Sequence, residues 1–278
     1  MKLHDVSHDR NGYEQLAFFY EQNKDKVFDA IDLEISGWFD AFMAAPLGLA
    51  LDALQSESNE VHVSPVTPGS KKVLQKNGFL SYYGEESIPD SYNTTIPYKK
   101  VKPTDGKYFI RYVQDYFVGR PELPSLSEGL AKKIAEGMLE LFQNAVIHSQ
   151  ASRIYTCGQF FPHAHSIIFC LADNGIGFRK KFVQRFRKNI SSSSAIRWAM
   201  EDGHTTKKNA PGGLGLGILK KFIQRNNGLI QIVSYKGFYQ YNAYGDTIEQ
   251  MDYSFPGTIV TVEFRTDDRR SYRLKSEI

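Results

Sequence analysis

Hydrophobic and polar positions in the first part of the chain predict strands and helices in succession. The predicted strands cover residues 26–34, 60–66 and 94–101, and the predicted helices cover 38–54, 70–79 and 106–118. The helix over 38–54 is apolar on most faces, which predicts burial, and Pro46 is expected to kink or divide it. Strands that alternate with helices are typical of a small α/β layer structure.

A segment containing two prolines and a glycine, Gly119–Ser127, separates this part from the rest of the chain. We place a domain boundary there, which gives one domain over 1–120 and a second over 121–278. The next segment, 127–149, has apolar residues three and four positions apart and predicts an amphipathic helix with Ser125 as its cap.

The second domain is predicted to return to strands after this helix. The predicted strands cover 153–160, 166–172, 228–235 and 258–264, the first two as an antiparallel hairpin, and a further helix covers 217–227. Between them, residues 178–211 are basic and Ser-rich, which predicts a long mobile segment.

Composition narrows the class of protein without identifying it. Hydrophobic residues make up 41% and charged residues 23%, which excludes a disordered, collagen-like or coiled-coil chain. A net charge of +3 is too small to indicate a nucleic-acid partner. Two cysteines, a polar N-terminus and the lack of a long apolar stretch predict a soluble cytoplasmic protein without membrane contact.

Three segments of the second half contain residues suited to chemistry. Glu140 and Asn144 are one helical turn apart, so a carboxylate that can activate water lies beside an amide oxygen that can hold Mg²⁺. Asp173 follows an apolar strand, and Gly175 and Gly177 after it let the backbone approach a planar ligand. The run Gly212–Gly217 opens a helix, where bare N–H groups attract phosphate.

Each segment alone is weak evidence, but their order along the chain is specific, and Gly257-Thr258 follows them at the start of the last strand. With ELFQNAVIH, DNGIG, GGLGLGI and GT in this order, residues 124–265 resemble the GHKL-type ATPase domain. Sensor histidine kinases, DNA gyrase B subunits, MutL proteins and anti-sigma serine kinases share that domain. The resemblance implies a Bergerat-type α/β sandwich with ATP and Mg²⁺ as cofactors.

The resemblance also implies a role for each motif residue. Asn144 would hold Mg²⁺, Glu140 would be the catalytic base and a further candidate metal ligand, and Asp173 would bind the adenine amino group. The remaining assignments are Gly175 and Gly177 to the adenine pocket, Gly213, Leu214, Gly215, Leu216 and Gly217 to the phosphates, Thr258 to the support of Asp173, and Lys207 and Lys208 to the terminal phosphate. Residues 178–211 would form the ATP lid, and their basic run 179–188 would help to attract triphosphate, with contact to nucleic acid as the alternative for this run.

Two functions follow from this resemblance. By the first, the chain would be an ATP-dependent regulator that hydrolyses ATP or transfers its γ-phosphate to a protein, in the manner of anti-sigma kinases. By the second, it would be a non-catalytic ATP-sensing interaction module. Histidine autophosphorylation is not expected, because no helix with an acceptor histidine precedes the domain. The partners implied are ATP, an unidentified protein partner or substrate, and a second copy of the chain.

The first domain more faintly resembles STAS domains, the fold of anti-sigma-factor antagonists. Its strand, loop and apolar helix follow their pattern, and Ala41 stands where their phosphorylatable serine would be. The resemblance implies a docking or sensing module without that hydroxyl, and an unrelated small α/β domain is the alternative.

Overall fold

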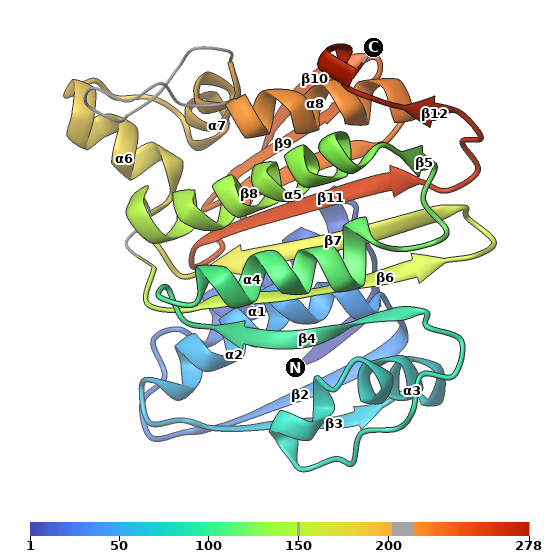
Figure 1. The fold of residues 1–278 in the computed structure, drawn as a ribbon. Coiled ribbons are helices and arrows are strands. Elements are labelled where there is room, and N and C mark those ends of the chain that lie inside the picture. The colour runs from blue at the N-terminus through green and yellow to red at the C-terminus, as the bar shows by residue number, and fades with distance from the viewer. Residues whose placement is uncertain (149–150, 202–213, 278) are drawn as a thin grey trace.

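The computed structural model describes residues 1–148, 151–201 and 214–277, with the backbone alone for 147–148 and 214–216. Its architecture is mixed α/β and is built on two separate sheets and one short strand pair (Figure 1). No helix among these residues has both the length and the apolar character needed to cross a membrane.

The N-terminal unit consists of strands and helices in alternation. Its elements are β1 (Lys2–Val6), α1 (Arg10–Asn23), β2 (Ala30–Phe39), η1 (Ala41–Met43), α2 (Ala44–Gln55), β3 (Glu60–Val66), α3 (Pro68–Lys76) and η2 (Leu80–Tyr83). The strands form a parallel sheet in the order β1-β2-β3. Parallel neighbours need crossover connections, and α1 and α2 provide them.

A seven-stranded sheet forms the centre of the molecule, in the order β10-β9-β8-β11-β7-β6-β4, with every neighbouring pair antiparallel. Its strands are β4 (Thr95–Val101), β6 (Ile154–Phe161), β7 (Ser166–Asp173), β8 (Leu229–Ser234), β9 (Gly237–Asn242), β10 (Gly245–Gln250) and β11 (Thr258–Arg265). The short strands β5 (Ser125–Leu126) and β12 (Ser271–Tyr272) pair with each other, and η5 (Lys275–Glu277) follows β12.

Both faces of the large sheet are covered. The helical elements of this half are α4 (Gly106–Val113), η3 (Gln114–Val118), α5 (Glu128–Gln143), η4 (Asn144–His148), α6 (Gly177–Phe186), α7 (Ser192–Met200) and α8 (Leu214–Asn226). Helices α4, α5 and α8 lie on one face, and α1, α2 and the small sheet lie on the other (Figure 1). Alternate side chains of β7 therefore enter two different cores, Cys170 on one side and Leu171 on the other. This explains why β7 is apolar at nearly every position.

The structure confirms the mixed α/β class and the β6–β7 hairpin. The division at residues 120 and 121 and the STAS-like and Bergerat-type assignments remain predictions. Strand β4 and helix α4 precede that boundary, yet β4 pairs with β6 and α4 packs on α5.

Three local predictions were wrong. The segment predicted as one helix over 38–54 begins as the end of β2, and α2 starts only at Ala44. Pro46 lies in the first turn of α2, where its missing N–H has no intrahelical acceptor, and so it does not divide the helix. Ser127, and not Ser125, caps α5, because its hydroxyl accepts a hydrogen bond from the backbone N–H of Leu130 at 3.2 Å.

Candidate functional site

Asp173 ends β7 at one edge of the large sheet, with Ile154 of β6 and Thr258 of β11 on either side of it in register. Its side chain is buried, with a relative exposure of 2% for the residue. One carboxylate oxygen, Oδ1, accepts a hydrogen bond from the backbone N–H of Gly175 at 2.9 Å. A buried carboxylate of this kind needs such partners, because leaving it without hydrogen bonds would be costly. The turn that follows the strand thus fixes the orientation of the Asp173 carboxylate.

Hydroxyl groups from two further strands lie beside Asp173. Thr258 opens β11 and is paired with Asp173 on one side and Ser234 on the other. The Thr258 and Ser234 hydroxyl oxygens are 3.2 Å apart, and Ser234 Oγ accepts from the N–H of Phe178 at 3.3 Å. The ends of β7, β8 and β11 and the start of α6 are therefore joined by polar side chains at one point.

Two glycines at this edge are required by close packing. A Cβ atom on Gly257 would lie 2.0 Å from the carbonyl oxygen of Asp173. Gly177 has φ +69°, and a Cβ there would come within 2.6 Å of the Tyr235 ring and 2.7 Å of the Ser234 hydroxyl. In the described structure the need for Gly177 thus comes from protein contacts at the base of α6.

Asn174 connects this turn to the end of α5. Its Oδ1 accepts from the backbone N–H groups of Ser152 and Arg153 at 3.0 and 3.2 Å, and its Nδ2 donates to the Ser152 hydroxyl at 2.8 Å. The adjacent Ala151 N–H donates to the carbonyl of Ala145 in η4 at 3.2 Å. Sequence reasoning gave Asn174 no role. The sequence signal that could have identified this role is that asparagine in a turn tends to form hydrogen bonds with nearby backbone groups.

Glu140 and Asn144 lie at that end of α5. Asn144 is the C-terminal capping residue of the helix, and its backbone N–H donates to the carbonyl of Glu140. Both side chains are partly exposed, whereas their neighbours Leu141 and Ala145 are buried in the core. The two polar side chains therefore lie at the margin of the buried face. The Ala151–Ala145 backbone bond, next to the Ser152 that Asn174 binds, brings this end of α5 towards the turn after Asp173.

Helix α8 begins at the same end of the molecule, on the left in Figure 1, where β7 ends and β11 begins. Its first turn consists of Leu214, Gly215, Leu216 and Gly217. Among these, only Gly217 has described surroundings, and a Cβ atom placed on it would have open space within 4 Å. Lys207, Lys208 and Gly213 lie outside the described residues. Within the predicted lid, 178–211, the chain forms α6 and α7, so that segment is more regular than its composition indicated.

The electrostatics of the edge are dominated by Asp173. The pKa of Tyr235 is raised, first by burial and then by the negative charge of Asp173, which places this phenol within reach of the carboxylate. Among the residues that the structure describes, no group of three or more His, Cys, Asp or Glu side chains is arranged to hold a metal ion by itself. A divalent cation here would therefore need ligands beyond such side chains.

The residues expected to form one site thus fall into three groups. The first group, at the end of β7, contains Asp173, Gly175, Gly177 and Thr258. The second group, at the C-terminal end of α5, contains Glu140 and Asn144. The third group is the first turn of α8, which begins at the same end of the molecule. No protein-family model matches this chain, and no curated protein matches it significantly.

Proposed function

We propose that the chain binds ATP with Mg²⁺ at the edge formed by Asp173, Asn144 and the first turn of α8, as GHKL-type ATPases do. The observation that carries the proposal is the buried Asp173 carboxylate, which is fixed by the Gly175 N–H and is followed by Asn174, whose side chain binds the backbone just before β6. A carboxylate held in this way is suited to accept a hydrogen bond from the adenine amino group, because charged acceptors form the stronger bonds.

The phosphates belong at the opposite side of the same edge. The first turn of α8 has backbone N–H groups without intrahelical partners, and these together with the helix dipole favour a phosphate. Asn144 offers an amide oxygen and Glu140 a carboxylate, which are the hard oxygen donors that Mg²⁺ accepts in addition to phosphate oxygens and water. Bound Mg²⁺ would neutralise phosphate charge, and Glu140 would take a proton from water or from a protein hydroxyl.

The adenine assignment is tested by the difference in affinity between ATP and inosine triphosphate, which lacks the amino group. The native chain is expected to prefer ATP, and Asp173→Asn is expected to weaken ATP binding about 10- to 100-fold and to remove that preference. Asparagine keeps the oxygen that accepts from Gly175, so the fold is retained. Asp32→Asn, an exposed change on β2, is the matched control. Unchanged ATP affinity in Asp173→Asn would show that the adenine assignment is wrong.

The use of ATP is tested by following its labelled γ-phosphate in the presence of Mg²⁺. If Glu140 is the base, label appears as free phosphate or on a protein, and Glu140→Ala lowers the rate by about 100-fold or more. Glu136→Ala removes a carboxylate one turn earlier on α5 and is expected to leave the rate unchanged. Label that stays on bound ATP in the native chain favours the non-catalytic ATP-sensing module. In either case the proposal places the protein in the cytoplasm with a protein partner or a second copy.

A further inference from the structure

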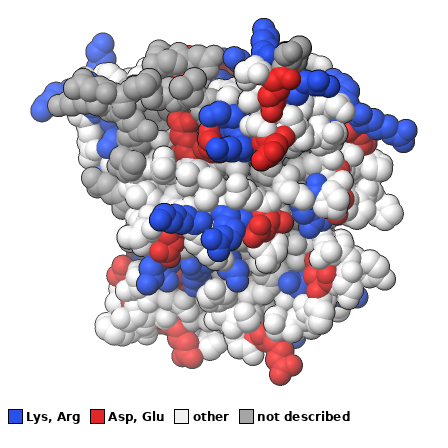
Figure 2. Space-filling view, in the orientation of Figure 1, with Lys and Arg blue, Asp and Glu red and all other residues white. Residues whose placement is uncertain are grey.

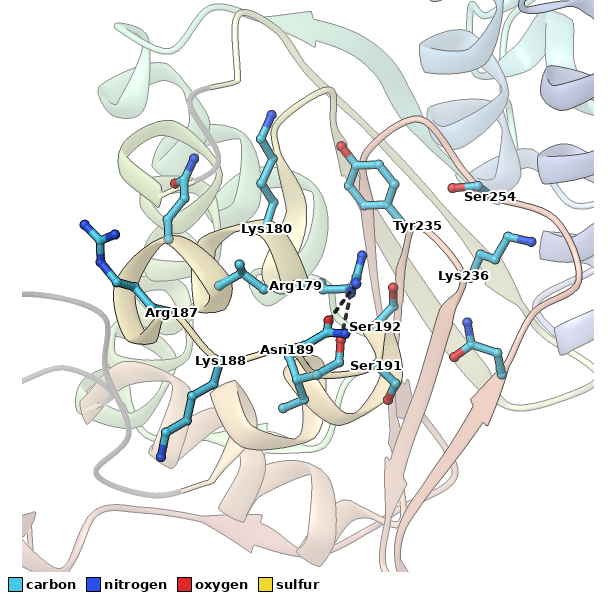
Figure 3. Close-up of a pocket in the computed structure, with 14 residues that line it drawn as sticks. Arg179, Lys180, Arg187, Lys188, Asn189, Ser191, Ser192, Tyr235, Lys236 and Ser254 are labelled. Carbon is cyan, nitrogen blue, oxygen red and sulfur yellow. Dashed lines mark hydrogen bonds between the residues drawn. The ribbon is translucent and has the colours of Figure 1, made fainter.

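A hollow lies beside the proposed nucleotide site, between α6, the start of α7 and the turn from β8 to β9 (Figure 3). Its volume is about 1590 Å³, above the range of about 300–1,000 Å³ usual for small-molecule pockets. Five of its lining residues are cationic, namely Arg179, Lys180, Arg187, Lys188 and Lys236. We call this feature the basic groove.

The basic groove is unbalanced in charge. No Asp or Glu is among its lining residues, and none of its five cations forms an ion pair within the described part of the chain. Some cations elsewhere are neutralised by a carboxylate, as when Arg197 of α7 contacts Asp246 at 2.9 Å or Arg270 contacts Asp268 at 2.8 Å. Figure 2 likewise shows acidic and basic side chains interspersed across the middle of the visible face.

Two of the cations are held in place by neutral groups. Arg179 donates from Nε to the carbonyl of Ile190 at 2.7 Å and from Nη2 to Asn189 Oδ1 at 2.8 Å (Figure 3). Lys236 Nζ donates to the backbone carbonyl of Asp252 at 2.7 Å. These bonds fix the positions of both charges without neutralising them. The groove therefore presents a positive potential that an anion from outside the chain would satisfy.

The spacing of the charges favours an extended polyanion. Helix α6 has ten residues and so spans about 15 Å. Arg179 and Lys180 lie near its start, and Arg187 and Lys188 follow its end. One phosphate group can contact only one end of this row. A chain with several charges can contact both ends at once.

An aromatic side chain distinguishes between the polyanions. The half-buried Tyr235 ring lines the groove beside Gly177 at the start of α6, and Lys236 follows it in the chain (Figure 3). Proteins that bind single-stranded nucleic acids combine a basic groove with an aromatic ring, since the phosphate backbone of the nucleic acid follows the cations while a base stacks on the ring. An acidic peptide would use the cations equally well but gives the ring no role. We infer that the basic groove binds single-stranded nucleic acid through its phosphates, with a base on Tyr235.

The inference differs from the expectation based on composition, because a net charge of +3 does not by itself indicate a nucleic-acid partner. The local charge of the groove matters more than the total. The groove adjoins the proposed nucleotide site, because Tyr235 lies beside Asp173 and Gly177, but none of Asp173, Asn144 and Glu140 lines it.

Fluorescence anisotropy with a labelled mixed-sequence single-stranded oligonucleotide, at several salt concentrations, tests this inference on the full chain. The variant Lys180→Ala/Arg187→Ala/Lys188→Ala is expected to lose about 100-fold in affinity near 0.1 M salt and to reduce the slope of log affinity against log salt by about 2. Tyr235→Ala is expected to lose about tenfold, whereas Tyr235→Phe keeps the ring and the affinity.

The matched control is Lys24→Ala/Lys72→Ala/Lys102→Ala, which removes three exposed lysines outside the groove. Thermal unfolding checks that both triple variants are folded. The inference would be overturned by equal losses in both triple variants. It would also be overturned if the native chain did not bind the oligonucleotide at about 50 mM salt, where contacts with phosphates are strong. Tighter binding of a polyglutamate peptide would assign the groove to an acidic protein. Displacement by MgATP that Asp173→Asn abolishes would assign it to the nucleotide site.

Discussion

Among single residues, His8 holds an unusual position between the N-terminal unit and the large sheet. Its Nε2 lies 3.4 Å from Glu263 Oε2 on β11, and its Nδ1 lies 3.8 Å from Asp40 Oδ2 after β2. Burial alone would lower the pKa of His8, but the two neighbouring carboxylates raise it to about 9. The imidazolium form therefore links two parts of the molecule.

This raised pKa predicts a pH-dependent stability. Because the folded-state pKa lies above the unfolded value of 6.5, the contribution of His8 is complete below pH 6.5 and is lost as the pH rises through 9. Urea unfolding is expected to show His8→Gln about 2 kcal/mol less stable than the native chain at pH 6, and much less different at pH 10. His163→Gln, an exposed histidine, is the control. A His8→Gln deficit that is the same at both pH values would contradict the prediction.

At the scale of elements, the contact between the DNGIG turn and the start of β6 depends on one side chain. Asn174→Ala removes the acceptor of the Ser152 and Arg153 N–H groups, so both amides are expected to exchange hydrogen at least tenfold faster. Asn174→Asp keeps that acceptor oxygen and loses only the bond to the Ser152 hydroxyl, so it should keep the protection. Hydrogen exchange followed by mass spectrometry measures this. Fast exchange in Asn174→Asp as well would contradict the assigned role.

Sequence reasoning predicted two strands closely and missed elements whose packing depends on distant segments. Strand β3 was predicted with the bounds that the structure has, and β7 to within a residue, because β7 lies between two cores. Strand β1 was missed, since three of its five residues are exposed and polar. The segment that forms α6 and α7 was expected to be mobile because it is basic and Ser-rich, and its composition does not reveal the contact of Phe182 with Trp198. Such long-range contacts are absent from any local pattern.

The same limit applies to the candidate site. The order of the motifs identified Asp173 and Thr258, and the antiparallel register brings these two together. The link through Asn174 could not be predicted, because it depends on which segments meet in space. The basic run 179–188 is visible in the sequence, but the groove that it forms with Tyr235 and Lys236 is not. The glycine run 212–217 was predicted as a phosphate site; its last four residues form the first turn of α8, and residues 212 and 213 lie outside the described residues.

At the scale of the whole molecule, the two sheets share one core. Phe42 and Leu49 of the N-terminal unit belong to the same buried cluster as Cys157 and Cys170 of the large sheet. Polar groups cross the boundary too: Gln159 Oε1 accepts from the N–H of Ala41 at 2.5 Å. Ala41, at the position where STAS domains have a phosphorylatable serine, is itself fully buried against β6. Separating the two parts would expose this cluster to water, at about 25 cal/mol for each Å² of apolar surface.

The shared core predicts that the two halves of the chain unfold together. The chain has two tryptophans, Trp38 at the end of β2 and Trp198 in α7, so each half carries its own fluorescent reporter. In the variant Trp198→Phe the fluorescence comes from Trp38 alone, and in Trp38→Phe it comes from Trp198 alone. In a urea titration, the fluorescence transition of each variant is expected to coincide with its unfolding transition in far-ultraviolet circular dichroism. Coincident transitions within each variant are the signature of a single cooperative unit. If the Trp38 signal were lost at a lower urea concentration than the circular dichroism, the N-terminal unit would unfold on its own, and the shared core would contribute less than its burial indicates.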